Sequence, residues 1–192
     1  MDLLEIIRKR RSIRKYQDKK VPREILDKII DAGLYAPSAG GGQRSKIVAI
    51  QDKALCEYLG RINYSTFSRG NLAGSYVSSD QPSIIDDPSI RNAFYGAPSV
   101  CVIFSPRNFL YGIPDAFCMA ENMVLEAYSL GVSSCIVARA EDTFSTAEGK
   151  KLLEEWNIPD ALVARCFVTL GYCEGEYPPV KERKENRTLI IE

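Results

Sequence analysis

Three arginines and a serine lie within five residues near the start of the chain, in the segment Arg10-Arg11-Ser12-Ile13-Arg14. A guanidinium presents a planar fork of N–H donors that matches the oxygen atoms of a phosphate, and the serine hydroxyl adds a neutral donor. A hydrogen bond to a charged group contributes about 1.5–3 kcal/mol. The segment therefore indicates a phosphate site, and a solvated basic face is the alternative interpretation of the same composition.

Three later segments would suit a flat, anionic ligand. Residues 36–43 read Ala-Pro-Ser-Ala-Gly-Gly-Gly-Gln, and consecutive glycines let a planar group approach the backbone closely. Residues 131–136, Gly-Val-Ser-Ser-Cys-Ile, follow a predicted helix, and residues 181–184, Lys-Glu-Arg-Lys, place further cations near the end of the chain. For this last segment, a charged solvated tail is the alternative interpretation.

The order of these four segments resembles that of the nitroreductase family of FMN-dependent oxidoreductases, from about Asp2 to Arg187. The resemblance implies an α+β fold with a mixed central β-sheet flanked by helices, and a homodimer in which the C-terminal strands are exchanged. It implies FMN as the cofactor, with NADH or NADPH as the electron donor. Residues 1–192 would then form one domain, with 61–95 as a substrate-side loop or lid and 176–192 extending onto the partner subunit.

The resemblance also implies where individual residues contact FMN, and it implies no catalytic side chain, because the cofactor carries the hydride. The residues it places on the phosphate, ribityl and pyrimidine side are Arg10, Arg11, Ser12, Arg14, Lys181 and Arg183. The residues it places around the ring are Pro37, Ser38, Ala39, Gly41, Gln43, Ile136, Val137 and Ala138. Arg14 is expected at the N1/O2 edge, where a guanidinium stabilises the negative charge of the reduced ring.

One departure from the family's usual pattern concerns the loop at 36–43. Many relatives carry Asn and then Gln-Pro-Trp there, whereas this chain has Gly41 and then Gln43-Arg44-Ser45. A side-chain contact to the flavin is therefore missing or replaced by backbone amides. This departure affects redox tuning and substrate preference, and it does not threaten FMN binding itself.

Hydrophobic periodicity and turn signals predict the elements that position these segments. Helices are expected after a cap at Asp2, after Pro22, and at residues 52–60, 115–130 and 147–156. Strands are expected at residues 46–50, 100–104, 135–138 and 162–170. Because strands and helices do not alternate strictly, the pattern favours an α+β domain over a doubly wound one.

A long stretch without clear periodicity runs from Arg61 to Ser89. It is polar and rich in Ser, Gly and Asp, and such a stretch inside a compact domain is typical of a functional loop, with disorder as the alternative. The aromatic residues in and beside it favour a surface that folds over a ligand; they are Tyr64, Phe67, Tyr76 and Tyr95. We expect residues 61–95 to shape the mouth of the site and to set the choice of electron acceptor.

The composition argues against several other functions. Lys and Arg number 25 and Asp and Glu number 25, so the formal net charge of zero predicts neither a nucleic-acid nor a membrane partner, although residues 8–20 form a basic cluster. The chain has no His, the usual base of a Ser or Cys nucleophile. The glycines at 40–42 match neither the dinucleotide-binding nor the Walker pattern.

The six cysteines contain no Cys-x-x-Cys pair, so we expect reduced thiols and no metal site. With no secretory segment and no apolar run of about 20 residues, the expected location is the cytoplasm.

The predicted activity is transfer of two electrons from NAD(P)H through FMN to a nitroaromatic, quinone or similar conjugated acceptor, by a ping-pong mechanism. A flavin-binding sensor or storage protein without NAD(P)H turnover is the alternative. Bleaching of the flavin by NADH or NADPH would distinguish the two.

Overall fold

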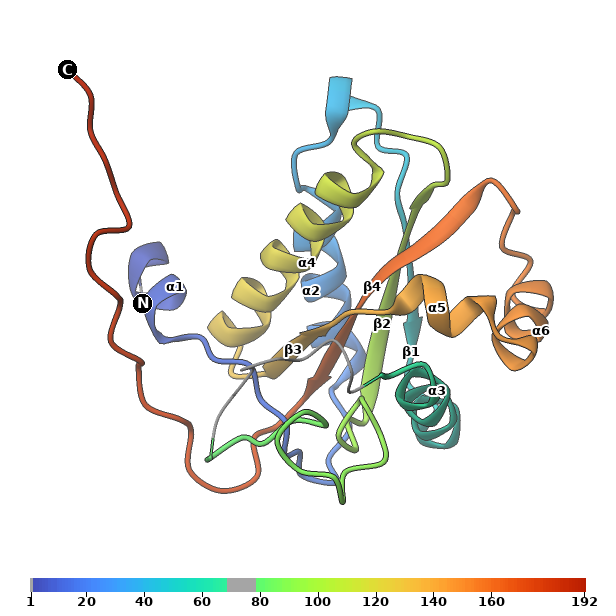
Figure 1. Cartoon of the computed structure of the whole chain (residues 1–192), viewed down its shortest axis with the longest axis horizontal. Coiled ribbons are helices and arrows are strands. Elements are labelled where there is room, and N and C mark those ends of the chain that lie inside the picture. The colour runs from blue at the N-terminus through green and yellow to red at the C-terminus, as the bar shows by residue number, and fades with distance from the viewer. Residues whose placement is uncertain (1, 69–78) are drawn as a thin grey trace.

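The structure is a computed structural model of the chain, and it describes residues 2–68 and 79–192 (Figure 1). The described helices are α1 (Leu3–Lys9), α2 (Arg23–Leu34), the 3₁₀ helix η1 (Ala39–Gly41), α3 (Lys53–Ser65), α4 (Gly112–Ser129), α5 (Ala140–Ser145) and α6 (Ala147–Glu155). The described strands are β1 (Lys46–Ile50), β2 (Ser99–Pro106), β3 (Ser133–Val137) and β4 (Leu162–Gly171). Within these ranges, none of the helices combines the length and apolar character needed to cross a membrane.

The four strands form one sheet in the order β1-β2-β4-β3, and every neighbouring pair is antiparallel. The predicted α+β class is confirmed, whereas the prediction of a mixed sheet is wrong for these strands. Within the described ranges, parallel pairing is limited to an isolated bridge between Ser12 and Ser134. The apolar runs of β2 and β4 reflect burial on both faces by helices, and that burial does not require parallel strands.

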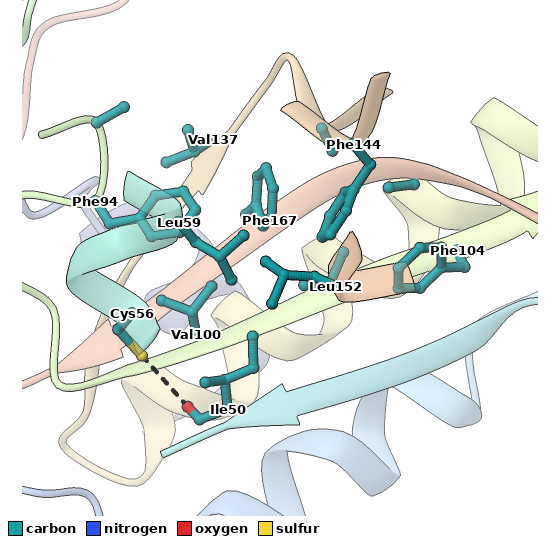
Figure 2. Packing of buried hydrophobic residues seen from close by; sticks show 14 of the residues in the cluster. Ile50, Cys56, Leu59, Phe94, Val100, Phe104, Val137, Phe144, Leu152 and Phe167 are labelled. Carbon is teal, nitrogen blue, oxygen red and sulfur yellow. Dashed lines mark hydrogen bonds between the residues drawn. The ribbon is translucent and has the colours of Figure 1, made fainter. Parts of the chain in front are cut away.

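Helices cover both faces of the sheet and divide the core into two layers (Figure 1). On one face, α2 and α4 pack against the sheet around Ile29, Met123 and Val168. On the other face, α3, α5 and α6 surround an aromatic cluster (Figure 2), in which the Phe94 and Phe167 ring centroids lie 4.7 Å apart. Burying each large apolar side chain stabilises the fold by about 1.5–3 kcal/mol.

Most element boundaries follow local signals in the sequence. The carboxylate of Asp2 accepts a hydrogen bond from the Glu5 N–H at 2.8 Å, so the predicted cap of α1 is confirmed. The helix predicted from 115 begins one turn earlier, at Gly112, and ends just before Gly131, which has a φ of 74°. The sequence prediction missed α5 altogether.

The irregular stretch is shorter than predicted, because α3 continues to Ser65 instead of ending near residue 60. Tyr76 lies outside the described residues. Further along, Ile84, Ala93 and Phe94 are at most 3% exposed and belong to the aromatic core. The C-terminal part of the predicted loop therefore packs as core.

Candidate functional site

The basic segment is held along the outer edge of β3. The Ile13 N–H donates to the Ser134 carbonyl at 2.9 Å, and the Ile13 side chain is fully buried. Tyr16 forms a second bridge, with Cys173, and its hydroxyl lies 2.8 Å from the Thr169 hydroxyl. These contacts fix the segment at both ends and leave the intervening Arg14 only partly buried.

The C-terminal segment after β4 lies against the same arginines. The Tyr177 hydroxyl accepts a hydrogen bond from the Arg11 N–H at 2.8 Å, and the Arg11 Nε donates to the Pro179 carbonyl at 3.1 Å. Burial lowers the pKa of the Arg11 guanidinium, and the nearby Arg183 cation lowers it further. The fold therefore brings cations from positions 11 and 183 together.

Several donors in this region are buried without a partner. Arg10 Nε, Arg11 Nη2 and the Ser134 hydroxyl have no hydrogen-bond partner among residues 2–68 and 79–192. Among the described residues, Arg10, Arg11 and Arg183 form no ion pair. Each unsatisfied buried donor costs about 1–3 kcal/mol, so an oxyanion that accepts these hydrogen bonds would relieve the cost.

A cavity of about 130 Å³ lies beside the basic segment, at the end of β3. Its walls are formed by Arg14, Ser83, Ile84, Ile85, Tyr95, Cys135, Ile136, Val137, Ala138 and Arg139. The Arg14 guanidinium carbon lies 5.9 Å from the Tyr95 ring centroid, and the Arg14 backbone N–H donates to the Gln81 side chain. Four residues predicted for the site therefore do meet, namely Arg14 and the three residues 136–138.

A turn at Ala138–Arg139 closes this cavity, and a buried asparagine holds the turn. Asn63, on α3, donates to the Ala138 carbonyl at 2.9 Å and to the Thr143 hydroxyl at 2.9 Å. Its side-chain oxygen accepts from the Arg139 Nη2 at 2.6 Å. Arg139 has a φ of 62°, and burial lowers the pKa of its guanidinium.

The loop at 36–43 is held at the start of α4. The Ala39 N–H donates to the Asp115 carboxylate, with distances of 3.1 and 3.3 Å to its two oxygens. Gly41 has a φ of 62°, a value that suits glycine. Arg44 donates to the Ala39 carbonyl at 2.9 Å and lies 4.9 Å from the Phe109 ring centroid. The residue that departs from the family pattern, Arg44, therefore stabilises the loop through these two contacts.

Within one chain, this loop and the basic segment lie at opposite ends of α4 (Figure 1). A helix of 18 residues is about 27 Å long. Ser38 and Gln43 border a separate cavity of about 150 Å³, together with Leu34, Ala36, Ser45 and Met119. The fold therefore does not bring residues 37–43 to Arg14 or to residues 136–138.

The model of the family described as "Nitroreductase family" matches residues 7–172. The chain belongs to this family. A solved nitroreductase with bound FMN from Bacteroides fragilis superposes with a TM-score of 0.82 at 26% identity, and the alignment covers 100% of both chains. A second solved nitroreductase with bound FMN, from Desulfitobacterium hafniense, has the same fold, with a TM-score of 0.82 at 22% identity over 100% of both chains.

Curated relatives of this chain are oxidoreductases by name. One from Methanothermobacter thermautotrophicus, provisionally named NADH dehydrogenase/NAD(P)H nitroreductase, is 29% identical over 90% of this chain and 78% of its own length. A protein from Pseudomonas sp. named CR(VI) reductase is 22% identical over 87% of this chain and 65% of its own length. The nitroreductase family membership predicted from the four segments is confirmed.

Sequence reasoning missed Asn63, and it gave the Arg139 side chain no role in the site. Asn63 follows Cys56 and Leu59 on the buried side of α3, so a polar residue at the spacing of the apolar stripe was the available signal. Arg139 gave no local signal, because its role depends on a turn between β3 and the short helix α5.

Proposed function

We propose that this nitroreductase binds FMN and passes two electrons from NADH or NADPH to a nitroaromatic, quinone or similar conjugated acceptor. The observation that carries the proposal is the group of unpaired donors on Arg10, Arg11 and Ser134, beside the Arg183 charge. The FMN bound by the relative from Bacteroides fragilis supports the choice of ligand.

The unsatisfied donors fit the phosphate of FMN. Arg10 and Arg11 would donate to it, with Ser12 beside them on the bridge to β3. Lys181 and Arg183, on the C-terminal segment, would complete the group of cations around the phosphate. Since no carboxylate pairs with Arg10, Arg11 or Arg183 among the described residues, phosphate binding would not have to break an internal ion pair.

The cavity at the end of β3 would accept one edge of the ring. Ala138 is exposed there, and its backbone N–H would serve the N5 position. Arg14, supported by Tyr95 and Gln81, would stabilise negative charge at N1 and O2. FMN, when bound, would supply the hydride chemistry itself, and the protein would position and polarise without an acid or base of its own.

The distance between the loop and the basic segment supports a homodimer with two sites at its interface. Pro37, Ser38 and Ala39, with Gly41 and Gln43, would come from the partner and lie against the ring. Exposed apolar side chains on α1 and α4 would form the contact; they are Leu3 at 65%, Leu4 at 53%, Ile113 at 54% and Phe117 at 39%. A monomer in light scattering that retains FMN would contradict the dimer.

Two segments would complete the dimer and its site. Residues 176–192 would extend onto the partner, where the exposed run from 188 to 191 adds a strand. Residues 61–95 would border the acceptor side. The six thiols, all unpaired, fit a reducing compartment, and the cytoplasm remains our proposal.

The double variant Arg10→Gln/Arg11→Gln tests the phosphate site. It should weaken FMN binding by roughly 100-fold, since each charged hydrogen bond contributes about 1.5–3 kcal/mol. Fluorescence titration of FMN measures the change, and the exposed pair Lys150→Gln/Lys151→Gln on α6 is the control. Unchanged affinity in the arginine variant would remove the phosphate assignment.

Turnover separates the enzyme from the alternative function. Anaerobic NADH or NADPH should bleach the visible absorption of the flavin, and an acceptor should restore it. Initial-rate lines should run parallel if donor and acceptor use one slot in turn. A stable yellow protein indifferent to both nucleotides would instead be a flavin-binding sensor or storage protein.

A further inference from the structure

Among the described residues, the walls of the cavity at the end of β3 carry two guanidiniums, of Arg14 and Arg139, and no carboxylate. The other wall groups are neutral. Asp86, on the adjoining segment, accepts from the Ser83 N–H at 2.9 Å and from its hydroxyl at 3.0 Å. Asp142 acts on the charge of Arg139 from the first turn of α5, but forms no ion pair with it within the described residues. The cavity is therefore cationic.

The Arg139 guanidinium is fixed before any ligand arrives. Its carbon lies 5.2 Å from the Phe67 ring centroid, and its Nη2 donates to Asn63 at 2.6 Å. Its Nε is buried and has no hydrogen-bond partner in the part of the chain that the structure describes. A guanidinium stacked on an aromatic ring keeps the donors at its planar edge available for an oxyanion.

The proposed function uses Arg14 at the cofactor and leaves Arg139 without a role. The cofactor phosphate has its own group of donors at Arg10 and Arg11. Sites for drug-sized ligands usually measure roughly 300–1,000 Å³, whereas this cavity measures about 130 Å³. It therefore has room for one end of a bound molecule, such as a ring edge or a single substituent, and not for a whole nucleotide.

We propose that Arg139 is a specificity-determining residue that binds an anionic group, a carboxylate or sulfonate, on the electron acceptor. This inference rests on the proposed function, because it assumes that the acceptor occupies the space beside residues 136–139. The natural acceptors of this nitroreductase are then conjugated acids, and neutral analogues are poorer substrates.

A matched pair of acceptors tests the inference on the FMN-saturated protein. The wild type should reduce 4-nitrobenzoate with a higher kcat/KM than 4-nitrobenzamide. Arg139→Gln should lower kcat/KM for the benzoate about tenfold, the effect of one charge-assisted hydrogen bond, and should leave the benzamide within about twofold. Gln retains a donor for Asn63, and Arg139→Lys should recover part of the loss because it restores the charge.

A binding measurement tests the same site without turnover. Benzoate is not reduced, and calorimetry should show about tenfold weaker binding to FMN-saturated Arg139→Gln than to the wild type. If NADH and NADPH fail to reduce the flavin while this difference persists, the proposed reaction is wrong and the anion site stands.

Three results would overturn the inference. Equal benzoate affinity in the wild type and in Arg139→Gln would remove the anion site. An equal loss of kcat/KM for both acceptors would assign Arg139 a purely structural role. A loss confined to kcat/KM for NADH or NADPH would assign the guanidinium to the phosphates of the donor.

Discussion

Asn63 shows how one buried side chain can shape a site it does not enter. It is fully buried on α3, yet its amide group bonds the Ala138 carbonyl, the Thr143 hydroxyl and the Arg139 guanidinium. A left-handed conformation costs a residue other than glycine about 1–2 kcal/mol. The bonds of Asn63 offset this cost at Arg139, and they keep the exposed Ala138 amide at the edge of the cavity.

Replacing Asn63 by Leu should therefore destabilise the protein. The change leaves buried polar groups on the turn without hydrogen-bond partners, so the free energy of unfolding should fall by about 2–4 kcal/mol. Urea denaturation measures it, with Asn108→Ala, in an exposed loop, as a control expected to stay within about 0.5 kcal/mol. A loss no larger than the control's would mean that the turn holds itself.

Three buried thiols make stability sensitive to alkaline pH. Burial raises the pKa of Cys56, Cys101 and Cys166 from 9.0 to about 12. Between these values the unfolded chain loses protons that the folded chain keeps. The contribution of these thiols to the free energy of unfolding is therefore fully present below about pH 9 and is lost as the pH rises toward 12. Each thiol contributes a slope of about 1.4 kcal/mol per pH unit.

Urea unfolding between about pH 8.5 and pH 10.5 should reveal this decline. Cys166→Ala should reduce the part of the slope that the three thiols cause by about one third. Exposed Cys118→Ala is the matched control and should leave the slope as it is. A slope that Cys166→Ala fails to change would place the titration elsewhere.

At the scale of elements, the first turn of α4 and the loop at 36–43 behave as one unit. Asp115 is 7% exposed and provides the acceptor for the Ala39 N–H, while Arg44 closes the loop from the other side. The loop carries Ser38 and Gln43, which we propose lie against the FMN ring that the partner subunit binds. Its shape therefore depends on a carboxylate that contacts no ligand.

Asp115→Ala should weaken FMN binding about tenfold, because a buried N–H is left without an acceptor and the loop loses its support. Asp115→Asn retains an acceptor oxygen and should recover most of the affinity. Titration of FMN fluorescence measures both variants. Equal losses in the two would show that the charge of Asp115, and not its hydrogen bond, supports the loop.

The strands were predictable to within about two residues because their apolar, β-branched runs are local signals. The helix α5 and the C-terminal end of α3 were not. Six-residue α5 is too short to show a helical period, and the predicted helix ended at residue 60, whereas α3 continues to Ser65. A Cβ at Gly60 would lie 1.9 Å from the Asn92 side-chain oxygen. That glycine is there for a close contact between distant segments, which no local pattern reveals.

The site itself was only partly predictable. Donor chemistry pointed to Arg14 and the family resemblance pointed to residues 136–138, and the fold does bring them to one cavity. Sequence order could not tell that the loop at 36–43 lies at the far end of α4, because that depends on how α4 packs on the sheet. Nor could it reveal Asn63 or a role for the Arg139 side chain, because their contacts join α3 to the turn before α5.

For the whole molecule, the C-terminal tail carries a run of strongly exposed apolar side chains. Leu189, Ile190 and Ile191 are 85%, 82% and 87% exposed in the single chain. Truncation after Arg187 should lower dimer stability and then FMN content, although Lys181 and Arg183 remain. Sedimentation and thermal melting measure this, and an unchanged melting temperature with full cofactor content would mean that the tail is idle.

The basic segment and the loop at 36–43 lie at opposite ends of α4, and this separation has a genetic consequence. Consider a dimer in which one subunit carries Arg10→Gln/Arg11→Gln and the other carries Asp115→Ala. One of its two sites then combines the altered basic segment with the altered loop, and the other site combines the two wild-type parts. Two defective proteins, co-expressed in equal amounts, should thus complement each other and restore about one quarter of the wild-type sites. Mixed dimers purified with two different affinity tags should bind one FMN tightly. If each site were instead built from a single chain, the mixed dimer would contain no wild-type site.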